Sequence, residues 1–341
     1  GQTGNDRIAE YQYLATYGFL TGKSYVYSAT DAKILNETKV PNPNVTWEIA
    51  NQANIGFDAF LFNNKISFSA DYFNNLRTQI LIQRNASVPS TAGFTLPPEN
   101  IGKVKNTGFE GVIGYNGQSG AFNYSISANG SYAKNEIVFW DETPGIPPYQ
   151  QSTGRPMGSS LYYNAIGIFK DQGAIDAYPH WAGAMPGDVI FEDVNKDNKI
   201  DGLDRVMNDY NNMPRFIGGA TVDLKYKGFD LTMLIQGATG ARVYLGVESG
   251  EIGNFYKEYA DNRWTPENPS STYPRTWNRD EEYWRIQGNT FWLQNMNYVR
   301  LKNLEIGYSL PASVNQSLHI SLLRFYVNGQ NLLTSAKQDF I

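Results

Sequence analysis

Several residue types on which active sites depend are scarce or absent in this sequence of 341 residues. There is no cysteine, which excludes a disulfide framework, thiolate chemistry and cysteine-ligated zinc. Only two histidines occur, His180 and His319, and neither accompanies a Gly-x-Ser-x-Gly or His-Glu-x-x-His motif. We therefore predict that the protein is not an enzyme.

Charged residues and long apolar runs are also scarce. Charged residues make up 18% of the chain, and the net charge of −5 comes without a basic cluster, so we expect no nucleic-acid partner. No run of 18 apolar residues exists, which excludes a transmembrane helix. A transmembrane β-strand needs only about 9–11 residues, of which alternate ones are apolar. A membrane β-barrel is therefore compatible with the sequence.

Aromatic residues and glycine are abundant: aromatic residues make up 14% of the chain, and there are 32 glycines. Apolar and polar residues alternate with period two in several segments, which indicates strands with two different faces. The clearest of these segments are 65–72, 123–132, 220–226, 229–236 and 323–327, and weaker ones are 55–62, 109–115 and 299–308.

Short and long connections alternate along most of the chain. Short turns are predicted at Asn63–Asn64, at 117–120 and at Lys227–Gly228, because Asn and Gly adopt positive φ at low cost. Long connections are predicted at 83–103, 138–213 and 241–296. Outer-membrane barrels place short turns in the periplasm and long loops outside. A soluble sandwich is the alternative, but the apolar faces here mix Tyr and Phe with aliphatic residues. The pattern favours an all-β fold, a portion of an antiparallel transmembrane β-barrel.

Three stretches carry a family resemblance. The first is Gly187–Arg205. The second is Pro214–Gly219, running into Tyr226–Leu231 and Gln236–Gly237. The third is Tyr298–Tyr308 with Leu310–Pro311, followed by Arg324–Thr334. Together they resemble the C-terminal half of SusC/RagA-type TonB-dependent outer-membrane transporters, and the likeness spans nearly the whole chain. The resemblance implies a plugged barrel of about 22 strands. Residues 1–341 would be its C-terminal part, with the plug, the first strands and the last strand outside this sequence.

The resemblance also implies a function and partners. Such a protein would import oligosaccharide or peptide across the cell outer membrane, driven by TonB through the absent N-terminal part. A SusD-like surface lipoprotein would cover the pore. Two other classes stay open: a soluble or surface-exposed carbohydrate-binding β module with a structural calcium, and a glycoside hydrolase using Asp141–Glu142 or Glu281–Glu282.

An acidic loop at 193–204, inside the long connection 138–213, is the strongest chemical motif. Its oxygen-bearing residues have the spacing of an EF-hand-type calcium loop, with one position served by a backbone carbonyl. The predicted structural Ca²⁺ ligands are Asp193, Asn195, Asp197, Lys199 (through its carbonyl), Asp201 and Asp204. The alternative is a solvated turn in which Asp and Asn bond the local backbone.

Aromatic residues in the long connections are the second candidate site, because sugar C–H faces pack on aromatic rings. The predicted substrate contacts are Trp140, Tyr149, Tyr162, Trp181, Trp264, Trp277 and Trp284. Loop packing or an interfacial aromatic girdle is the alternative. Four arginines, Arg77, Arg155, Arg242 and Arg263, are candidates for lining the lumen or a loop, against ordinary surface charge.

Overall fold

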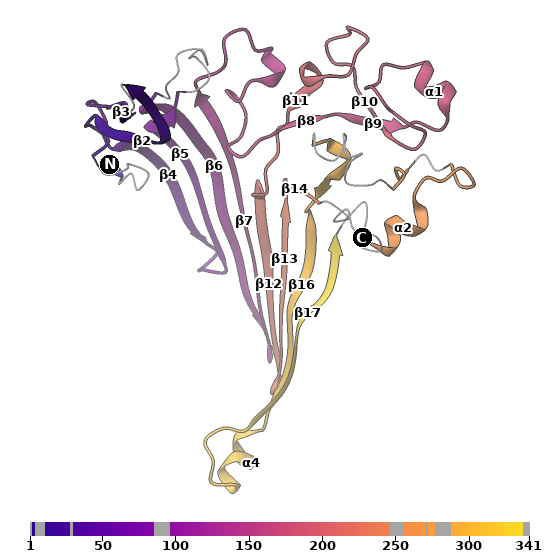
Figure 1. Ribbon diagram of the computed structural model, residues 1–341. Coiled ribbons are helices and arrows are strands. Elements are labelled where there is room, and N and C mark those ends of the chain that lie inside the picture. Colours follow the sequence, from indigo (N-terminus) through magenta and orange to yellow (C-terminus); the bar gives the residue numbers. More distant parts are fainter. Residues whose placement is uncertain are drawn as a thin grey trace. The chain divides into compact units, whose positions relative to one another are not determined.

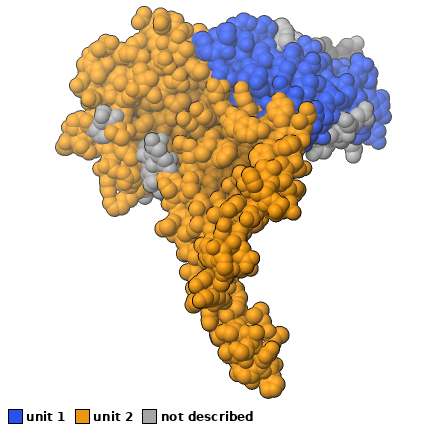
Figure 2. Space-filling view, turned by 180° about the vertical axis from the view of Figure 1, so that it is seen from behind, with its two compact units in different colours: residues 1–54, 73–107, 135–157 blue, residues 55–72, 108–134, 158–341 orange. Residues whose placement is uncertain are grey.

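The computed structural model describes residues 2–3, 11–27, 30–84, 96–245, 256–269, 272–276 and 288–336. In this part of the chain, no helix combines the length and the apolar character that crossing a bilayer requires. The chain divides into two compact units, which are coloured separately in Figure 2. Unit 1 comprises residues 1–54, 73–107 and 135–157, and unit 2 comprises residues 55–72, 108–134 and 158–341.

Within the described residues, nine strands form one sheet whose order follows the chain, β1-β4-β5-β6-β7-β12-β13-β16-β17 (Figure 1). The strands are β1 (Gln2–Thr3), β4 (Glu48–Leu61), β5 (Ile66–Gln83), β6 (Pro98–Ser119), β7 (Phe122–Phe139), β12 (Phe216–Tyr226), β13 (Phe229–Thr239), β16 (Tyr298–Ser309) and β17 (Arg324–Ala336). From β7 to β17 each neighbouring pair is antiparallel. The sheet is open, with β1 and β17 at its edges. Strands that pair in chain order are the arrangement of up-and-down barrels.

The tight turns follow the predicted chemistry, with one difference. Lys227 (φ 46°) and Gly228 (φ 88°) join β12 to β13, and the turn that contains Asn63 and Asn64 also has positive φ. The turn predicted at 117–120 is narrower, because β6 continues to Ser119. The β16–β17 connection is longer than a tight turn and contains α4 (Ala312–Ser317).

Short elements give the long connections structure of their own. The connection between β7 and β12 contains the 3₁₀ turn η2 (Pro148–Gln150), β8 (Leu161–Tyr163), β9 (Ala165–Ile168), α1 (Gln172–Asp176), β10 (Val189–Phe191), the 3₁₀ turn η3 (Gly202–Asp204) and β11 (Arg205–Met207). The connection between β13 and β16 contains β14 (Arg242–Tyr244), α2 (Lys257–Asn262), the 3₁₀ turn η5 (Thr290–Trp292) and β15 (Leu293–Asn295). β9 pairs with β10, β8 with β11 and β14 with β15.

The main buried core of unit 2 lies among these loop elements. It consists of Tyr163, Phe169, Ile175, Trp181, Val189, Phe191, Ile200, Tyr259, Tyr273 and Trp292. Ring centroids of Tyr163 and Phe191 are 4.9 Å apart, and those of Tyr259 and Trp292 are 5.9 Å apart. Because its members come from both long connections, the two loops form a single packed body.

A buried ion pair ties the same two loops together. Arg275 Nε donates to Asp188 Oδ1 over 2.6 Å, and the two side chains are 14% and 2% exposed. Asp188 Oδ2 accepts the Met185 amide, and the Arg275 amide donates to the Gly187 carbonyl. Tyr259 donates its hydroxyl proton to the Arg275 carbonyl over 2.7 Å.

Unit 1 contains a hairpin that the sequence pattern did not predict. It pairs β2 (Thr16–Tyr27) with β3 (Thr30–Lys39), with register shifts after Thr16 and after Phe19. Irregular register interrupts the strict alternation on which the strand predictions relied. In the same unit, Arg77 forms an ion pair with Glu48 over 2.6 Å.

Candidate functional site

The apolar face of the main sheet has a row of aromatic residues beside the tight turns. Cross-strand register aligns five of them across β7, β12, β13, β16 and β17, namely Phe122, Tyr226, Phe229, Tyr308 and Phe325. Centroids of Phe229 and Tyr308 are 4.5 Å apart, and those of Phe122 and Tyr226 are 6.4 Å apart. Aromatic side chains in such a band are typical of the membrane–water interface of outer-membrane barrels.

The same face stays exposed farther along the strands. Ile306 and Val327 are partners in register and are 52% and 78% exposed. A sandwich would bury such side chains against a second sheet. The main core of unit 2 instead lies among the loops. This arrangement favours a lipid-facing surface over the soluble carbohydrate-binding module.

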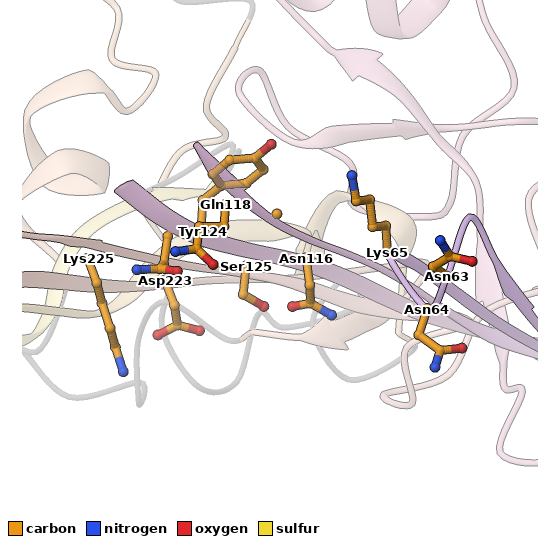
Figure 3. Close-up of a pocket in the computed structure, with 11 residues that line it drawn as sticks. Asn63, Asn64, Lys65, Asn116, Gln118, Tyr124, Ser125, Asp223 and Lys225 are labelled. Atoms are coloured by element: carbon orange, nitrogen blue, oxygen red, sulfur yellow. The ribbon is translucent and has the colours of Figure 1, made fainter. Parts of the chain in front are cut away.

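The opposite face is polar. Unit 2 has a recess of about 630 Å³. Among the residues that line it, Asn116, Ser125 and Asp223 point to one side while Tyr124 and Lys65 point to the other (Figure 3). Thr232 Oγ1 donates to Asp223 Oδ1 over 2.7 Å, in register across β12 and β13. Strands with one apolar face and one polar face suit a barrel with a water-accessible lumen.

An arginine on the polar face bridges three strands. Arg324 of β17 donates to Asp230 Oδ1 of β13 over 3.1 Å and to Glu305 Oε1 of β16 over 2.7 Å. The absence of a side chain at Gly307 makes room for it, since a Cβ there would lie 2.4 Å from Arg324 Nη2. The cluster lies on the same face as Asp223 and Thr232, so it continues the polar face toward the tight turns.

The acidic loop is ordered by its own hydrogen bonds. Asp193 accepts the amides of Asp197 and Asn198 over 3.2 and 3.0 Å. Lys196 and Asn198 adopt positive φ, 60° and 62°. The Asn195, Asp197 and Asp201 side chains each accept the amide two residues further on. These are the local Asx bonds of the alternative interpretation.

Asp204, the last predicted ligand, is fully buried. Its Oδ1 accepts the Val194 amide over 2.9 Å and its Oδ2 accepts the Asp201 amide over 2.8 Å. Burial raises the pKa of the Asp204 carboxyl, while the amide bonds oppose that rise. Within the described residues, no three or more His, Cys, Asp and Glu side chains are grouped to hold a metal. Calcium binding by the loop stays a prediction.

The predicted aromatic contacts have different surroundings. Trp181 is 7% exposed, with its ring 5.1 Å from that of Phe191 in the loop core, a packing role that leaves little surface for a ligand. Tyr162 stacks on Tyr244 at 5.8 Å, and half-buried Trp264 lies against Gly187. Unit 1 contains Trp140, which is 42% exposed, and Tyr149, which is half-buried. Trp277 and Trp284 lie outside the described residues, as does Glu281–Glu282.

The hydrolase candidates are occupied by structural contacts. Glu142 Oε1 accepts the Thr153 amide over 2.7 Å and the Thr153 hydroxyl over 2.8 Å. Asp141 lies 3.7 Å from Arg84. His180 Nδ1 lies 2.9 Å from the Tyr178 carbonyl, and His319 follows α4.

The four predicted arginines are divided between the two units. Arg77 pairs with Glu48 in unit 1, which also contains Arg155. Arg263 donates to the Ala260 carbonyl within its own loop. Arg242 lies over the Tyr210 ring, 4.2 Å from its centroid. Two further arginines were not predicted as site residues: Arg215, which lies over the Tyr210 ring, and Arg300, which lies over the Tyr298 ring.

Comparison with known proteins settles the family. Residues 11–332 match the family model described as TonB dependent receptor-like, beta-barrel. The chain belongs to this family of TonB-dependent receptors. Its members are outer-membrane barrels and transporters, so the predicted family, fold class and outer-membrane location are confirmed, and the prediction that the protein is not an enzyme agrees with them.

Two curated relatives come from Formosa agariphila (strain DSM 15362 / KCTC 12365 / LMG 23005 / KMM 3901 / M-2Alg 35-1). TonB-dependent receptor P3 is 30% identical over 98% of this chain and 34% of its own, and TonB-dependent receptor P26 is 27% identical over the same shares. The chain therefore spans about a third of the length of these TonB-dependent receptors.

Solved structures show the same fold. The RagAB peptide transporter structure is similar to this chain with a TM-score of 0.68 and 25% identity, over 99% of this chain and 37% of that one. The RagAB peptide importer in the 'open-open' state gives a TM-score of 0.69 at 24% identity, over 98% and 36%. The strand pattern predicted from the sequence therefore belongs to a TonB-dependent receptor barrel.

Proposed function

We propose that the full-length protein is a TonB-dependent importer of an oligosaccharide or peptide, to which this chain contributes barrel wall and extracellular loops. The observation that supports this most strongly is the two-faced sheet. Its apolar face is exposed and bears an aromatic row beside the turns, and its opposite face is polar. The similarity to the RagAB peptide transporter makes a peptide a natural candidate, beside the oligosaccharide that the family resemblance implies.

In this mechanism the substrate binds at the outer mouth, among the long connections. It passes along the polar face when TonB moves a plug that belongs to the remainder of the protein. A SusD-like surface lipoprotein covers the loops and delivers the substrate. The single core that joins the two long connections supports this role, because a packed body presents a fixed surface to a partner.

The test is uptake by cells. Cells lacking the native gene are complemented with the full-length transporter, in the presence and absence of TonB, and given labelled oligosaccharide and peptide mixtures. We expect accumulation only when the transporter and TonB are both present. Uptake that is equal with and without the transporter would refute the proposed function.

A further inference from the structure

Arg215, Arg242 and Arg300 lie near the loop end of unit 2 without carboxylate partners among the described residues. All three are half-buried. Elsewhere in the described chain, Arg77, Arg275 and Arg324 each contact a carboxylate. Guanidinium groups that are left without an anion at the edge of a polar face are available to one that arrives with a ligand.

Two of these arginines share one aromatic ring. The Tyr210 centroid lies 5.5 Å from Cζ of Arg215 and 4.2 Å from Cζ of Arg242. The Arg215 guanidinium also donates to the Asp209 carbonyl, and the Arg242 amide donates to the Asn211 carbonyl over 2.8 Å. Both guanidinium groups are thus held against one aromatic ring, and this ordering lowers the entropy cost of binding an anion there.

Register places Arg215 on the polar face. The ladder continues one residue before β12, because the Arg215 amide donates to Thr239 and the Arg215 carbonyl accepts the Ala133 amide. Side chains alternate along a strand, so Arg215 shares the face of Thr221 and Asp223. The absence of a side chain at Gly240 provides room, since a Cβ there would lie 2.9 Å from Arg215 Cβ.

Arg300 lies on the same face of the neighbouring strands. It is in register with Gln236 of β13, which shares the face of Thr232. Its Nε donates to Thr334 Oγ1 over 3.0 Å, and its Cζ lies 5.1 Å from the Tyr298 centroid. Arg300 pairs with Gln236, and the Arg215 amide bonds to Thr239, three residues further along β13. Three residues of strand span about 10 Å, so an extended ligand can contact Arg215 and Arg300 together.

We infer that Arg215, Arg242 and Arg300 form a carboxylate-binding rim, which selects acidic oligomers for import. Arg215 and Arg242 bind one carboxylate, and Arg300 binds a second one deeper along the polar face. The shared chemistry is a chain with repeated carboxylates, as in an acidic peptide or an oligouronate. This inference rests on the proposed import function and adds the charge of its substrate.

The test uses the full-length transporter in detergent and two matched probe pairs. One pair is a glutamate-rich peptide and its amidated glutamine counterpart, and the other is oligogalacturonate and its methyl ester. Binding is measured by calorimetry for the wild type, Arg215→Gln/Arg242→Gln, Arg215→Lys/Arg242→Lys and the control Lys227→Gln, in the tight turn at the other end of β12. Heat-modifiable gel migration verifies that each variant is folded.

We expect the wild type to prefer the charged member of at least one pair, with an affinity that falls as salt rises. The double glutamine variant should lose about tenfold or more of that affinity and most of the salt dependence. The lysine variant, which retains charge without the planar stack, should lie between them. The control and every neutral probe should be unchanged. The pair that responds identifies peptide or oligouronate as the source of the carboxylate.

Equal affinity for charged and neutral probes in the wild type would overturn the inference and leave the import function standing, since uptake of the neutral oligomer would persist. If the glutamine variant lost affinity for the charged and the neutral probe equally, the inference would also be overturned, because the arginines would then have only a structural role. Cells that accumulate none of the four probes, nor the mixtures used for the uptake test, would refute the import function itself.

Discussion

At the scale of single residues, the buried Asp188–Arg275 pair should contribute strongly to the stability of the loops. Replacing Asp188 with alanine removes the carboxylate that the buried Arg275 guanidinium contacts, and breaking such a pair typically destabilises a protein by about 3–5 kcal/mol. Hydrogen exchange of the loop amides in the full-length protein should show opening that is easier by that amount. Lys257→Ala removes the exposed pair with Asp261 and should change nothing measurable. Equal protection in Asp188→Ala and the wild type would contradict the packed-loop description.

The buried Asp204 should make the stability of the acidic loop depend on pH. Burial raises its pKa above the ordinary value of 3.8, so the folded loop holds the proton more tightly than the unfolded loop. Stability from this group is therefore full below 3.8 and is lost as pH rises through the folded value. Hydrogen-exchange protection of the Val194 and Asp201 amides, after correction for intrinsic exchange, should therefore increase as the pH is lowered from above the folded pKa of Asp204 to 3.8. Asp204→Asn should abolish the change, and an unchanged profile in this variant would refute the assignment.

Calcium binding is a separate prediction for the same loop. The Asp193 amide lies 3.4 Å from the Tyr178 hydroxyl oxygen, so terbium bound at Asp193 should give tyrosine-sensitised luminescence. Excess Ca²⁺ should quench this signal by displacement, and Asp193→Ala should weaken it at least tenfold, since a hard cation needs its carboxylates. Asp171→Ala, a change to the N-cap of α1, is the matched control. No sensitised signal in the wild type would leave the hydrogen-bonded acidic turn as the whole explanation.

At the scale of elements, the aromatic row should anchor the strands in the membrane. Phe229 packs on Tyr308 and is 57% exposed on the isolated sheet, so lipid is expected to cover it. Phe229→Ala should lower the unfolding free energy of the full-length barrel in bilayers by about 2 kcal/mol. Ser127→Ala, on the polar face opposite Thr221, should have little effect. Equal destabilisation by both substitutions would contradict the assignment of the faces.

The sequence predicted those elements whose alternation is long and regular. The segments 123–132 and 229–236 lie inside β7 and β13, because one face of each strand is apolar along its length. Strands of three or four residues, such as β8 and β9, have no room for a period, and α4 is too short to show a helical one. These elements were therefore missed.

The candidate sites also differ in how far the sequence could predict them. The EF-hand-like spacing of the acidic loop is visible in the sequence because all its members lie within twelve residues. The loop core is not, since it joins Tyr163 to Trp292 across more than a hundred residues. Arg215 and Arg300 were missed because their shared face depends on strand register, which includes a shift between Leu234 and Ile235.

At the scale of the whole molecule, everything depends on which face of the sheet meets lipid. The chain contains no cysteine, so a single introduced cysteine can be labelled wherever it is placed, once any cysteines elsewhere in the full-length protein are replaced. The most direct measurement is spin-label accessibility at residues 229 to 234 of β13 in the full-length protein in bilayers. We predict that labels at 229, 231 and 233 are reached by lipid-soluble oxygen, and labels at 230, 232 and 234 by a water-soluble nickel reagent. Accessibility without this alternation, or apolar positions shielded from both reagents, would contradict the account.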